Sequence, residues 1–413
     1  MNKKVNPVTP KTKTHLYSSI IISLSALFSL PILAADSAQS TEQTMKFAYV
    51  ATYNPHGEGV YLMKVDAKDG SLTKDKLVSS VPNAAQLVLD KDSHHLYVAS
   101  EVADYNGSQH GSITAYAVNK QDGSLEKLNE VDSQGAGPVY LSINPTGKYL
   151  FVANYVSGSI ASFPIEKDGK LGSPSAVRQN SGDAGADKPA AAVEGSFAIS
   201  DHDGAHAHMI DVDPSGQFVY STDLGQDRIY QWRLDQATGV ISANNPAFVD
   251  ASSSGAGPRH FVFHPENKHL YLINEEASTL TSYVIDPESG KLTAEQTLSS
   301  LPEGYKGTSF AAGLVLSKDA HHLYVANRLH NSISQFNINE HGTLTMADNV
   351  WTRGDYPRTL VISPDGNSLY AMNQRSDNIT QFSIEPVSGK LTFTNRFTAV
   401  GSPSQMVFVN DRK

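Results

Sequence analysis

The amino-acid sequence predicts an all-β protein, a seven-bladed β-propeller with four-stranded blades that is closed by pairing of its N- and C-terminal strands. Three observations lead to this prediction. A turn motif recurs seven times, a strand-like motif recurs about 20 residues before the turns, and one unmatched strand remains at each end of the array. Repeats of roughly 50 residues that contain four strands are typical of propellers.

The turn motif consists of Gly, one further residue, and then Leu or Ile. Successive copies are 46 to 53 residues apart, except for one interval of 70 residues. Their glycines are Gly70, Gly123, Gly169, Gly239, Gly290, Gly342 and Gly389. The strand motif reads Leu-Tyr-Val-Ala-Asn at 323–327, and related strings occur at 150–154, 270–274 and 369–373. Aromatic and β-branched residues between Gly, Asn and Asp turns favour strands over helices.

One repeat illustrates how four strands fit into a unit. The inner strand is expected at 139–143, the second at 149–153 and the third at 159–164, and the outer strand opens at the following Gly-x-Leu turn. The first predicted strand of the chain, 46–51, is a second strand, whereas the last, 405–409, is an inner strand. Pairing of these two completes a blade and leaves no long unpaired sheet edge.

The first 45 residues have the layout of an export signal. Four lysines precede an apolar run over 20–30, Pro31 ends that run, and Ala34-Ala35 stand before Asp36. We expect a signal peptide at 1–35, a linker at 36–45 and the propeller at 46–410, with the mature protein periplasmic or secreted. Because Leu33 stands where a small residue is usual in cleavage sites, an uncleaved membrane anchor is the alternative.

Composition excludes several classes of function. The chain has 32 Lys plus Arg against 42 Asp plus Glu, a net charge of −10, which argues against nucleic-acid binding. It contains no cysteine, so disulfides, thiolate nucleophiles and zinc–thiolate sites are excluded. His206 and His208 are two residues apart, hence on one face of a strand, but no third metal ligand accompanies them at a convincing spacing. We therefore predict no metal, no cofactor, and no stable membrane partner after signal cleavage.

Superposition of the repeats predicts where polar side chains gather. The position at the start of each inner strand reads Ala85, Val139, His208, Arg259, Ala312, Arg358 and Ser404. The position at the end of each second strand reads Tyr53, Glu101, Tyr155, Leu224, Glu275, Arg328 and Gln374. Because adjacent strands are antiparallel, both positions lie at the same end of the propeller. The sequence thus predicts a polar cluster at one channel mouth.

Within this cluster we assign catalytic roles to His208, Arg259, Glu275 and Arg328, which belong to three consecutive blades. Substrate-binding roles are assigned to Arg358, Glu101, Tyr155 and His206. The alternative is that these groups only form salt bridges between blades. The long interval has its excess of residues within roughly 172–204, and this stretch forms either a surface loop or a flap over the mouth.

These residues and motifs resemble the seven-bladed propeller lactonase family, which includes the propeller-type 6-phosphogluconolactonase and the 3-carboxy-cis,cis-muconate lactonizing enzyme. The resemblance rests on five strings and covers about 47–409. The strings are Gly257-Pro-Arg-His-Phe261, Asn274-Glu275, Ala326-Asn-Arg328, Pro357-Arg358 and the recurring Leu-Tyr-Val-Ala-Asn with Gly-x-Leu. The resemblance implies a metal-independent catalytic set of one His, two Arg and one Glu, which falls on the same four residues.

The resemblance further implies hydrolysis of a sugar-acid lactone, with a small lactone or carboxylate as substrate. Arg259 and Arg328 are expected to stabilise the developing oxyanion, and Glu275 to stay ionised between them. His208 is then the candidate general base, with Glu275 orienting the imidazole or the water. Two alternatives remain open: a muconate-type lactonizing enzyme that uses the same site, and a non-catalytic binding propeller. The export signal argues against the phosphorylated substrate of a cytoplasmic pathway.

Overall fold

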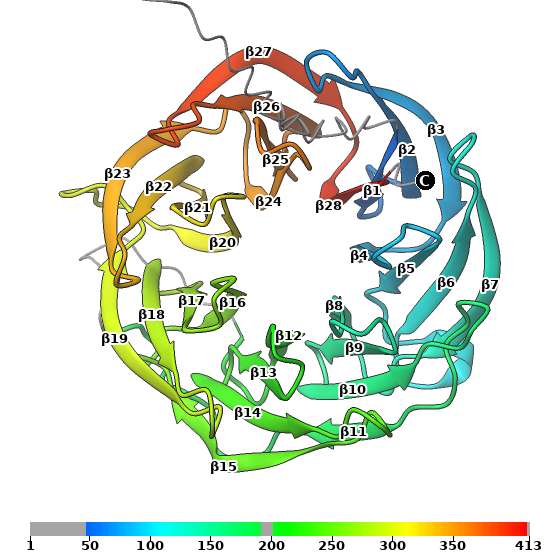
Figure 1. Cartoon of the computed structure of the whole chain (residues 1–413), viewed down its shortest axis with the longest axis horizontal. Helices are drawn as coiled ribbons and strands as arrows, with labels where there is room; N and C mark the ends of the chain where they lie inside the picture. The colour runs from blue at the N-terminus through cyan, green and yellow to red at the C-terminus, as the bar shows by residue number, and fades with distance from the viewer. Residues whose placement is uncertain (1–46, 191–200, 411–413) are drawn as a thin grey trace, which may run out of the picture. The chain divides into compact units, whose positions relative to one another are not determined.

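The computed structural model describes residues 47–190 and 201–410, and within these ranges the chain forms seven four-stranded antiparallel sheets arranged in a ring (Figure 1). The predicted seven-bladed propeller is therefore confirmed. The predicted signal peptide at 1–35 and linker at 36–45 lie outside the described residues, and so does residue 46. In the part of the chain that is described, no helix has the length and apolar character needed to cross a membrane.

Blade 1 contains both ends of the described chain. From the channel outwards it consists of β28 (Pro403–Phe408), β1 (Phe47–Thr52), β2 (Gly59–Val65) and β3 (Leu72–Ser80). Blade 2 consists of β4 (Ala84–Leu89), β5 (His95–Ser100), β6 (Ser112–Val118) and β7 (Leu125–Asp132). A short 3-10 helix, η1 (Tyr105–Gly107), precedes β6. Blade 3 consists of β8 (Pro138–Ile143), β9 (Tyr149–Asn154), β10 (Ser159–Pro164) and β11 (Ala176–Gln179).

The remaining blades follow the same order. Blade 4 consists of β12 (Ala207–Val212), β13 (Phe218–Asp223), β14 (Arg228–Leu234) and β15 (Ile241–Asp250). Blade 5 consists of β16 (Pro258–Phe263), β17 (His269–Asn274), β18 (Thr279–Ile285) and β19 (Leu292–Ser299). Blade 6 consists of β20 (Phe310–Leu316), β21 (His322–Arg328), β22 (Ser332–Ile338) and β23 (Leu344–Trp351). Blade 7 consists of β24 (Pro357–Ile362), β25 (Ser368–Asn373), β26 (Asn378–Ile384) and β27 (Leu391–Ala399).

The outer strand of blade 3 departs from the prediction. It was expected to open at the turn Gly169-Lys-Leu171, as the other outer strands do. Instead Leu171 makes only an isolated bridge to Ile165, and β11 begins five residues later at Ala176. Pro174 lies between them and has no N–H to donate to a strand ladder, so pairing resumes only after it. The stretch 172–204 is thus not wholly an insertion, since it contains β11.

The ring is closed as predicted, by pairing of the first and last described strands. β28 runs antiparallel to β1, with Tyr49 opposite Val407 and Val50 opposite Met406. Beyond the strand, the N–H of Val409 donates to the carbonyl of Phe47 at 2.9 Å. The side chain of Met406 is buried in the apolar cluster between blades 7 and 1. Blade 1 therefore depends on residues from both ends of the described chain.

The two repeated motifs contact each other across neighbouring blades. The tyrosine of a second strand donates its hydroxyl hydrogen to the glycine carbonyl of the next blade's turn motif, with oxygen–oxygen distances of 2.6 to 3.1 Å. The pairs are Tyr49–Gly123, Tyr97–Gly169, Tyr220–Gly290, Tyr271–Gly342, Tyr324–Gly389 and Tyr370–Gly70. All seven turn glycines have φ between 66° and 83°. Glycine is needed there because this backbone conformation disfavours a Cβ atom, which at Gly70 would also lie 2.6 Å from the Tyr370 hydroxyl.

Blade 3 lacks this tyrosine because Phe151 takes its place. At the seam between blades 3 and 4, the hydroxyl of Ser162 donates to the carbonyl of Gly239 at 2.7 Å, and that of Tyr149 to the carbonyl of Ala237 at 2.8 Å. The second strands themselves are buried on both faces, as in β13, where every residue from Phe218 to Asp223 is buried. Packed sheets on both sides explain why these strands read as continuous apolar runs in the sequence.

Candidate active site

A β-bulge occurs at the start of every inner strand, at one end of the ring. In each blade the ladder between inner and second strand skips one or two residues, as between Pro258 and His260. The skipped residues include all seven that the superposed repeats place at the start of an inner strand: Ala85, Val139, His208, Arg259, Ala312, Arg358 and Ser404. A bulge redirects the side chain of its extra residue, and bulges are common beside active sites.

The residues at the ends of the second strands lie at the same end of the ring, as predicted. Glu275 directly follows β17, and Arg328 is the last residue of β21. The buried asparagine before each of them fixes the end of the strand. Asn274 donates to the hydroxyl of Thr279 at 3.1 Å, and Asn327 donates to the carbonyl of Ser300 at 3.1 Å. The strand ends that carry Glu275 and Arg328 are thereby held in place by side-chain hydrogen bonds.

Glu275 pairs with two arginines. Its Oε2 lies 2.7 Å from Nε of Arg259 and 2.6 Å from a terminal nitrogen of Arg328, and the three side chains are 9%, 1% and 5% exposed. Burial alone would raise the pKa of Glu275, but the charges of Arg328 and Arg259 outweigh burial and lower it. Glu275 is therefore ionised at neutral pH, and the two guanidinium groups are held in fixed positions around one oxygen.

His208 is a buried, neutral imidazole beside this cluster. Its ring meets that of Tyr155 edge-on at 5.4 Å and that of His260 at 4.9 Å, measured between centroids. Among the described residues its buried Nδ1 has no hydrogen-bond partner. Burial, followed by the charge of Arg259 and the neighbouring His260, lowers the pKa of His208 well below 6.5. The imidazole is thus available as a proton acceptor at neutral pH.

The sequence analysis missed His260. A terminal nitrogen of Arg259 lies 3.2 Å from Nδ1 of His260, and the ring of His260 meets those of His208 and Tyr140 edge-on. Burial and the charge of Arg259 lower the pKa of His260 well below 6.5. The string Gly257-Pro-Arg-His-Phe261 contained this residue, but its position one residue beyond the bulge could not be recognised without knowing that a bulge exists.

Arg358, Glu101 and Tyr53 form a second polar group at the same mouth. A terminal nitrogen of Arg358 donates to the hydroxyl of Tyr53 at 3.0 Å, and Tyr53 donates a short hydrogen bond to Glu101. The charge of Arg358 also contributes to the lowered pKa values of Glu275 and His208. The structure therefore brings Arg358 close to the four predicted catalytic residues, whereas Glu101 reaches Arg358 through Tyr53.

Tyr155 contacts the long segment between β11 and β12, and His206 is the last residue of that segment. The hydroxyl of Tyr155 donates to Asp201 at 3.1 Å, and Nε2 of His206 lies 2.7 Å from a carboxylate oxygen of Asp203. His206 and His208 were expected on one face of a strand. His206 precedes β12, which begins at Ala207, and the bulge falls at His208, so the two residues do not lie in one regular strand, although both rings pack against that of Tyr155.

The described parts of this segment, 180–190 and 201–206, contact residues at the ends of β13 and β15. Asn180 donates to Asp223, and the N–H groups of Gly185 and Ala190 donate to the carbonyls of Gly225 and Ser254. His202 is buried against Glu276, with Nε2 to Oε2 at 3.2 Å, and lies 4.0 Å from Asp227. The neighbouring carboxylates of Asp227 and Glu276 raise the pKa of His202 to about 10. Asp227 in turn accepts hydrogen bonds from the backbone N–H groups of Gly255 and Gly257, immediately before Arg259. The segment is thus connected to the loop that positions Arg259.

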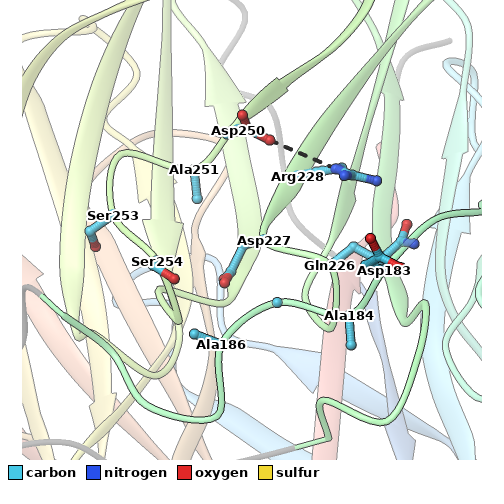
Figure 2. Close-up of a pocket in the computed structure, with 11 residues that line it drawn as sticks. Asp183, Ala184, Ala186, Gln226, Asp227, Arg228, Asp250, Ala251, Ser253 and Ser254 are labelled. Atoms are coloured by element: carbon cyan, nitrogen blue, oxygen red, sulfur yellow. Dashed lines mark ion pairs between the residues drawn. The ribbon is translucent and has the colours of Figure 1, made fainter.

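A hollow of about 520 Å³ lies beside this segment (Figure 2), and none of the four predicted catalytic residues lines it. Figure 2 shows Asp183, Ala184 and Ala186 of the segment on one side, and Asp250, Ala251, Ser253 and Ser254 on the other, with Arg228 facing Asp250 at 3.7 Å. A smaller hollow of about 400 Å³ lies next to the site. Its lining consists of His56, Tyr356, Arg358, Gln374, Arg375 and Ser402.

Comparison with known proteins gives consistent results. Residues 47–408 match a family model described as lactonase, seven-bladed β-propeller. A 6-phosphogluconolactonase of Bacillus subtilis strain 168 is 30% identical over 317 residues, which cover 76% of this chain and 84% of that protein. A 6-phosphogluconolactonase of Pectobacterium carotovorum is 29% identical over 295 residues, covering 71% and 78%. The solved structure of the periplasmic gluconolactonase of Pseudomonas aeruginosa superposes with a TM-score of 0.78 at 29% identity, covering 88% of this chain and 99% of that one.

Proposed function

This chain belongs to the family of seven-bladed β-propeller lactonases, and on that basis we propose that it hydrolyses the ester bond of a sugar-acid lactone. The names of its relatives support this reaction class, since those cited are called 6-phosphogluconolactonase or gluconolactonase. The observation that carries the proposal is the contact of Arg259 and Arg328 with one oxygen of Glu275, beside the neutral His208.

The first step is attack of water on the lactone carbonyl carbon. His208 accepts a proton from the water as its oxygen bonds to that carbon, and the carbonyl oxygen becomes negative. Arg259 and Arg328 supply fixed guanidinium donors for this oxyanion in a site where bulk water is largely excluded. Glu275 fixes both guanidinium groups, and because its pKa is lowered it stays ionised and does not compete for the proton.

The second step opens the ring. The bond between the carbonyl carbon and the ring oxygen breaks, and the leaving oxygen receives the proton held by His208. The low pKa of His208 favours this return of the proton, because its imidazolium form is disfavoured by burial and by Arg259. The product is an open-chain hydroxy acid, whose new carboxyl group releases its proton to solvent and faces the arginines as a carboxylate.

We propose that this chemistry proceeds without a metal. The carboxylate of Glu275 is occupied by two guanidinium groups, which would repel a divalent cation from the same position. We also propose that the protein acts in the periplasm. The basic and apolar N-terminal sequence supports this location, and the relative from Pseudomonas aeruginosa is itself called periplasmic.

The test is a hydrolysis assay with the purified protein. Acid release from a panel of aldonolactones is followed against the uncatalysed background, before and after treatment with a chelator. We expect accelerated hydrolysis of at least one lactone and no effect of the chelator. No acceleration on any lactone would contradict the proposed function, and loss of activity that only an added metal restores would contradict the metal-free mechanism.

A further inference from the structure

The imidazole of His260 contacts two of the four predicted catalytic side chains. A terminal nitrogen of Arg259 lies 3.2 Å from Nδ1 and 3.4 Å from Nε2 of His260. The ring of His208 meets that of His260 at 4.9 Å between centroids, with 74° between the two ring planes. The position of this one ring therefore affects both the proposed oxyanion donor and the proposed general base.

The backbone of His260 belongs to the strand ladder, and that of Arg259 does not. His260 pairs with Ile273 between β16 and β17, whereas the bulge skips Arg259, whose carbonyl accepts a hydrogen bond of 2.7 Å from the hydroxyl of Thr222. The guanidinium group of Arg259 contacts Glu275 at Nε and His260 at one terminal nitrogen. Among the described residues its other terminal nitrogen has no hydrogen-bond partner, so that nitrogen is left for a ligand.

Aromatic neighbours restrict the ring of His260. Besides His208, the ring of Tyr140 meets it edge-on at 5.1 Å between centroids, with 70° between the ring planes. Tyr140 is itself packed against two apolar clusters, one that contains Ile210 and one that contains Met209. Edge-on packing is a favourable arrangement of aromatic rings, so these contacts oppose rotation of the imidazole beside Arg259.

His260 can only accept a hydrogen bond from Arg259. A guanidinium group carries donors and no acceptor, and a neutral imidazole has one unprotonated nitrogen. Burial and the charges of Arg259, Arg358 and Arg328 lower the pKa of His260 well below 6.5, so that this nitrogen is unprotonated at neutral pH. His208 differs, because among the described residues its buried Nδ1 has no hydrogen-bond partner. The two neutral imidazoles are therefore suited to different tasks.

We propose that His260 is a positioning residue, which accepts a hydrogen bond from one terminal nitrogen of Arg259 and so directs the other at the oxyanion of the reaction. The inference rests on the proposed function and adds a residue to its mechanism. A guanidinium group is planar, so fixing Nε and one terminal nitrogen fixes the plane of the other. Because the oxyanion exists only after water has attacked, the contribution of His260 appears in kcat rather than in KM.

Two substitutions separate this role from a packing role. His260→Phe keeps an aromatic ring but has no acceptor, whereas His260→Asn loses the ring and keeps an acceptor close to the place of Nδ1. We expect kcat for lactone hydrolysis to fall about tenfold to a hundredfold in His260→Phe, the effect of losing one hydrogen bond to a charged group, and to stay within a few-fold of wild type in His260→Asn. KM should change little in either. Equal loss in both folded variants, or a greater loss in His260→Asn, would overturn the proposal.

A double-mutant cycle tests whether His260 acts through Arg259. Arg259→Met keeps a long side chain and has no N–H group. In this background His260→Phe should have little further effect on kcat, because the contact is already absent. Effects of the two substitutions that simply multiply would overturn the proposal. The matched control is His264→Phe, the same exchange at the residue that directly follows β16, and it should leave kcat unchanged in both backgrounds.

The contact can also be measured without turnover, so it stays testable if no lactone is hydrolysed and the proposed function fails. In nitrogen-15 NMR spectra of histidine-labelled protein, the signals of His260 are those absent from His260→Asn or His260→Phe. We expect a neutral imidazole at neutral pH, whose unprotonated nitrogen signal moves downfield when Arg259→Met removes the donor. The signal should not move in Arg396→Gln, which removes an arginine paired with Asp69 on the outer strand β27. A signal that Arg259→Met leaves unmoved, or a charged imidazole in the wild type, would overturn the proposal.

Discussion

Arg259 and Glu275 form a 2.7 Å ion pair within blade 5, although Arg259 lies in a bulge where the ladder between β16 and β17 skips it. Without the bulge, strand alternation would place residue 259 opposite a residue of β17 and direct its side chain according to the pleat. With the bulge, its guanidinium group reaches Glu275 beyond the end of β17. The same device places His208 and Arg358 in blades 4 and 7.

The first prediction concerns the arginine pair. Arg259→Gln and Arg328→Gln should each lower kcat/KM for lactone hydrolysis by about two to three orders of magnitude, because each removes one oxyanion donor. The double variant should lower kcat/KM by less than the product of the two single-variant factors, since both groups act around Glu275. Circular dichroism and a thermal melt check that each variant is folded. Wild-type rates in either folded single variant would contradict the assignment.

The second prediction concerns His208 and pH. Its lowered pKa means that the neutral, proton-accepting form persists as the pH falls below 6.5, so kcat/KM should stay level from neutral pH to below 6.5 and decline only in more acidic solution. The measurement is acid release in a pH-stat, corrected for spontaneous hydrolysis. His208→Ala should lose about two to four orders of magnitude in rate. A decline that begins above pH 6.5 would contradict the role of a buried imidazole.

For a protein that only binds its ligand, the same variant gives a different result. His208→Ala should then retain ligand affinity within a few-fold, because the arginines and not the imidazole hold the anion. Comparing affinity with turnover in this one variant therefore separates an enzyme from a binding propeller.

The third prediction concerns the contact of His202 with Glu276. The side chain of His202 is 3% exposed, and removing one partner of a buried pair costs about 3 kcal/mol or more, so His202→Asn should lower the free energy of unfolding at neutral pH by about that amount. The pKa of His202 is raised from 6.5 to about 10, so its contribution is complete below pH 6.5 and is lost as the pH rises toward 10.

Melting temperatures of wild type and His202→Asn across this pH range provide the measurement. Their difference should be largest near pH 6 and should shrink toward pH 10. His341→Asn, at an exposed turn, is the matched control and should match the wild type at every pH. A difference that grows with pH would contradict a stabilising contribution from the charged imidazole of His202.

The fourth prediction concerns the closing strand. Met406 of β28 is 1% exposed and packs between blades 7 and 1, so Met406→Ala should lower the free energy of unfolding by about 2 to 5 kcal/mol. Because each blade packs on two others, the whole propeller should still unfold in a single transition, at a lower temperature than the wild type. Val387→Ala, at a side chain that is 84% exposed, should change stability by less than about 0.5 kcal/mol. Separate melting of one blade, seen as a second calorimetric peak, would contradict this.

Much of the fold could be predicted because the repeats are regular. The turn glycines and the strand tyrosines recur because they contact each other across blades, as Tyr324 contacts Gly389, so periodicity in the sequence reports a contact that six of the seven seams make. The outer strand of blade 3 was misplaced because its position depends on where pairing can resume after Pro174. Nothing in the repeat specifies that point.

The ring positions of the site could also be predicted, since superposition of repeats identifies residues at one axial level without knowledge of their geometry. Three features of the site could not be predicted from the sequence. The bulges depend on the ladder between two strands, so His260 was overlooked. Tyr356 joins Arg328 to Arg375 through a backbone conformation that its residue type does not suggest. The contacts of His202 come from a segment whose sequence has no repeat to compare with.

Because β28 pairs with β1, the first and last described residues of the propeller lie side by side, and the ring could be cut at another turn without changing which blades are neighbours. Val409 and Phe47 lie within hydrogen-bonding distance, so a short linker can join the two ends, and new termini can be opened in an exposed turn such as the one at Gly147. In such a circular permutant every blade would be built from one continuous stretch except blade 3, which would inherit the split.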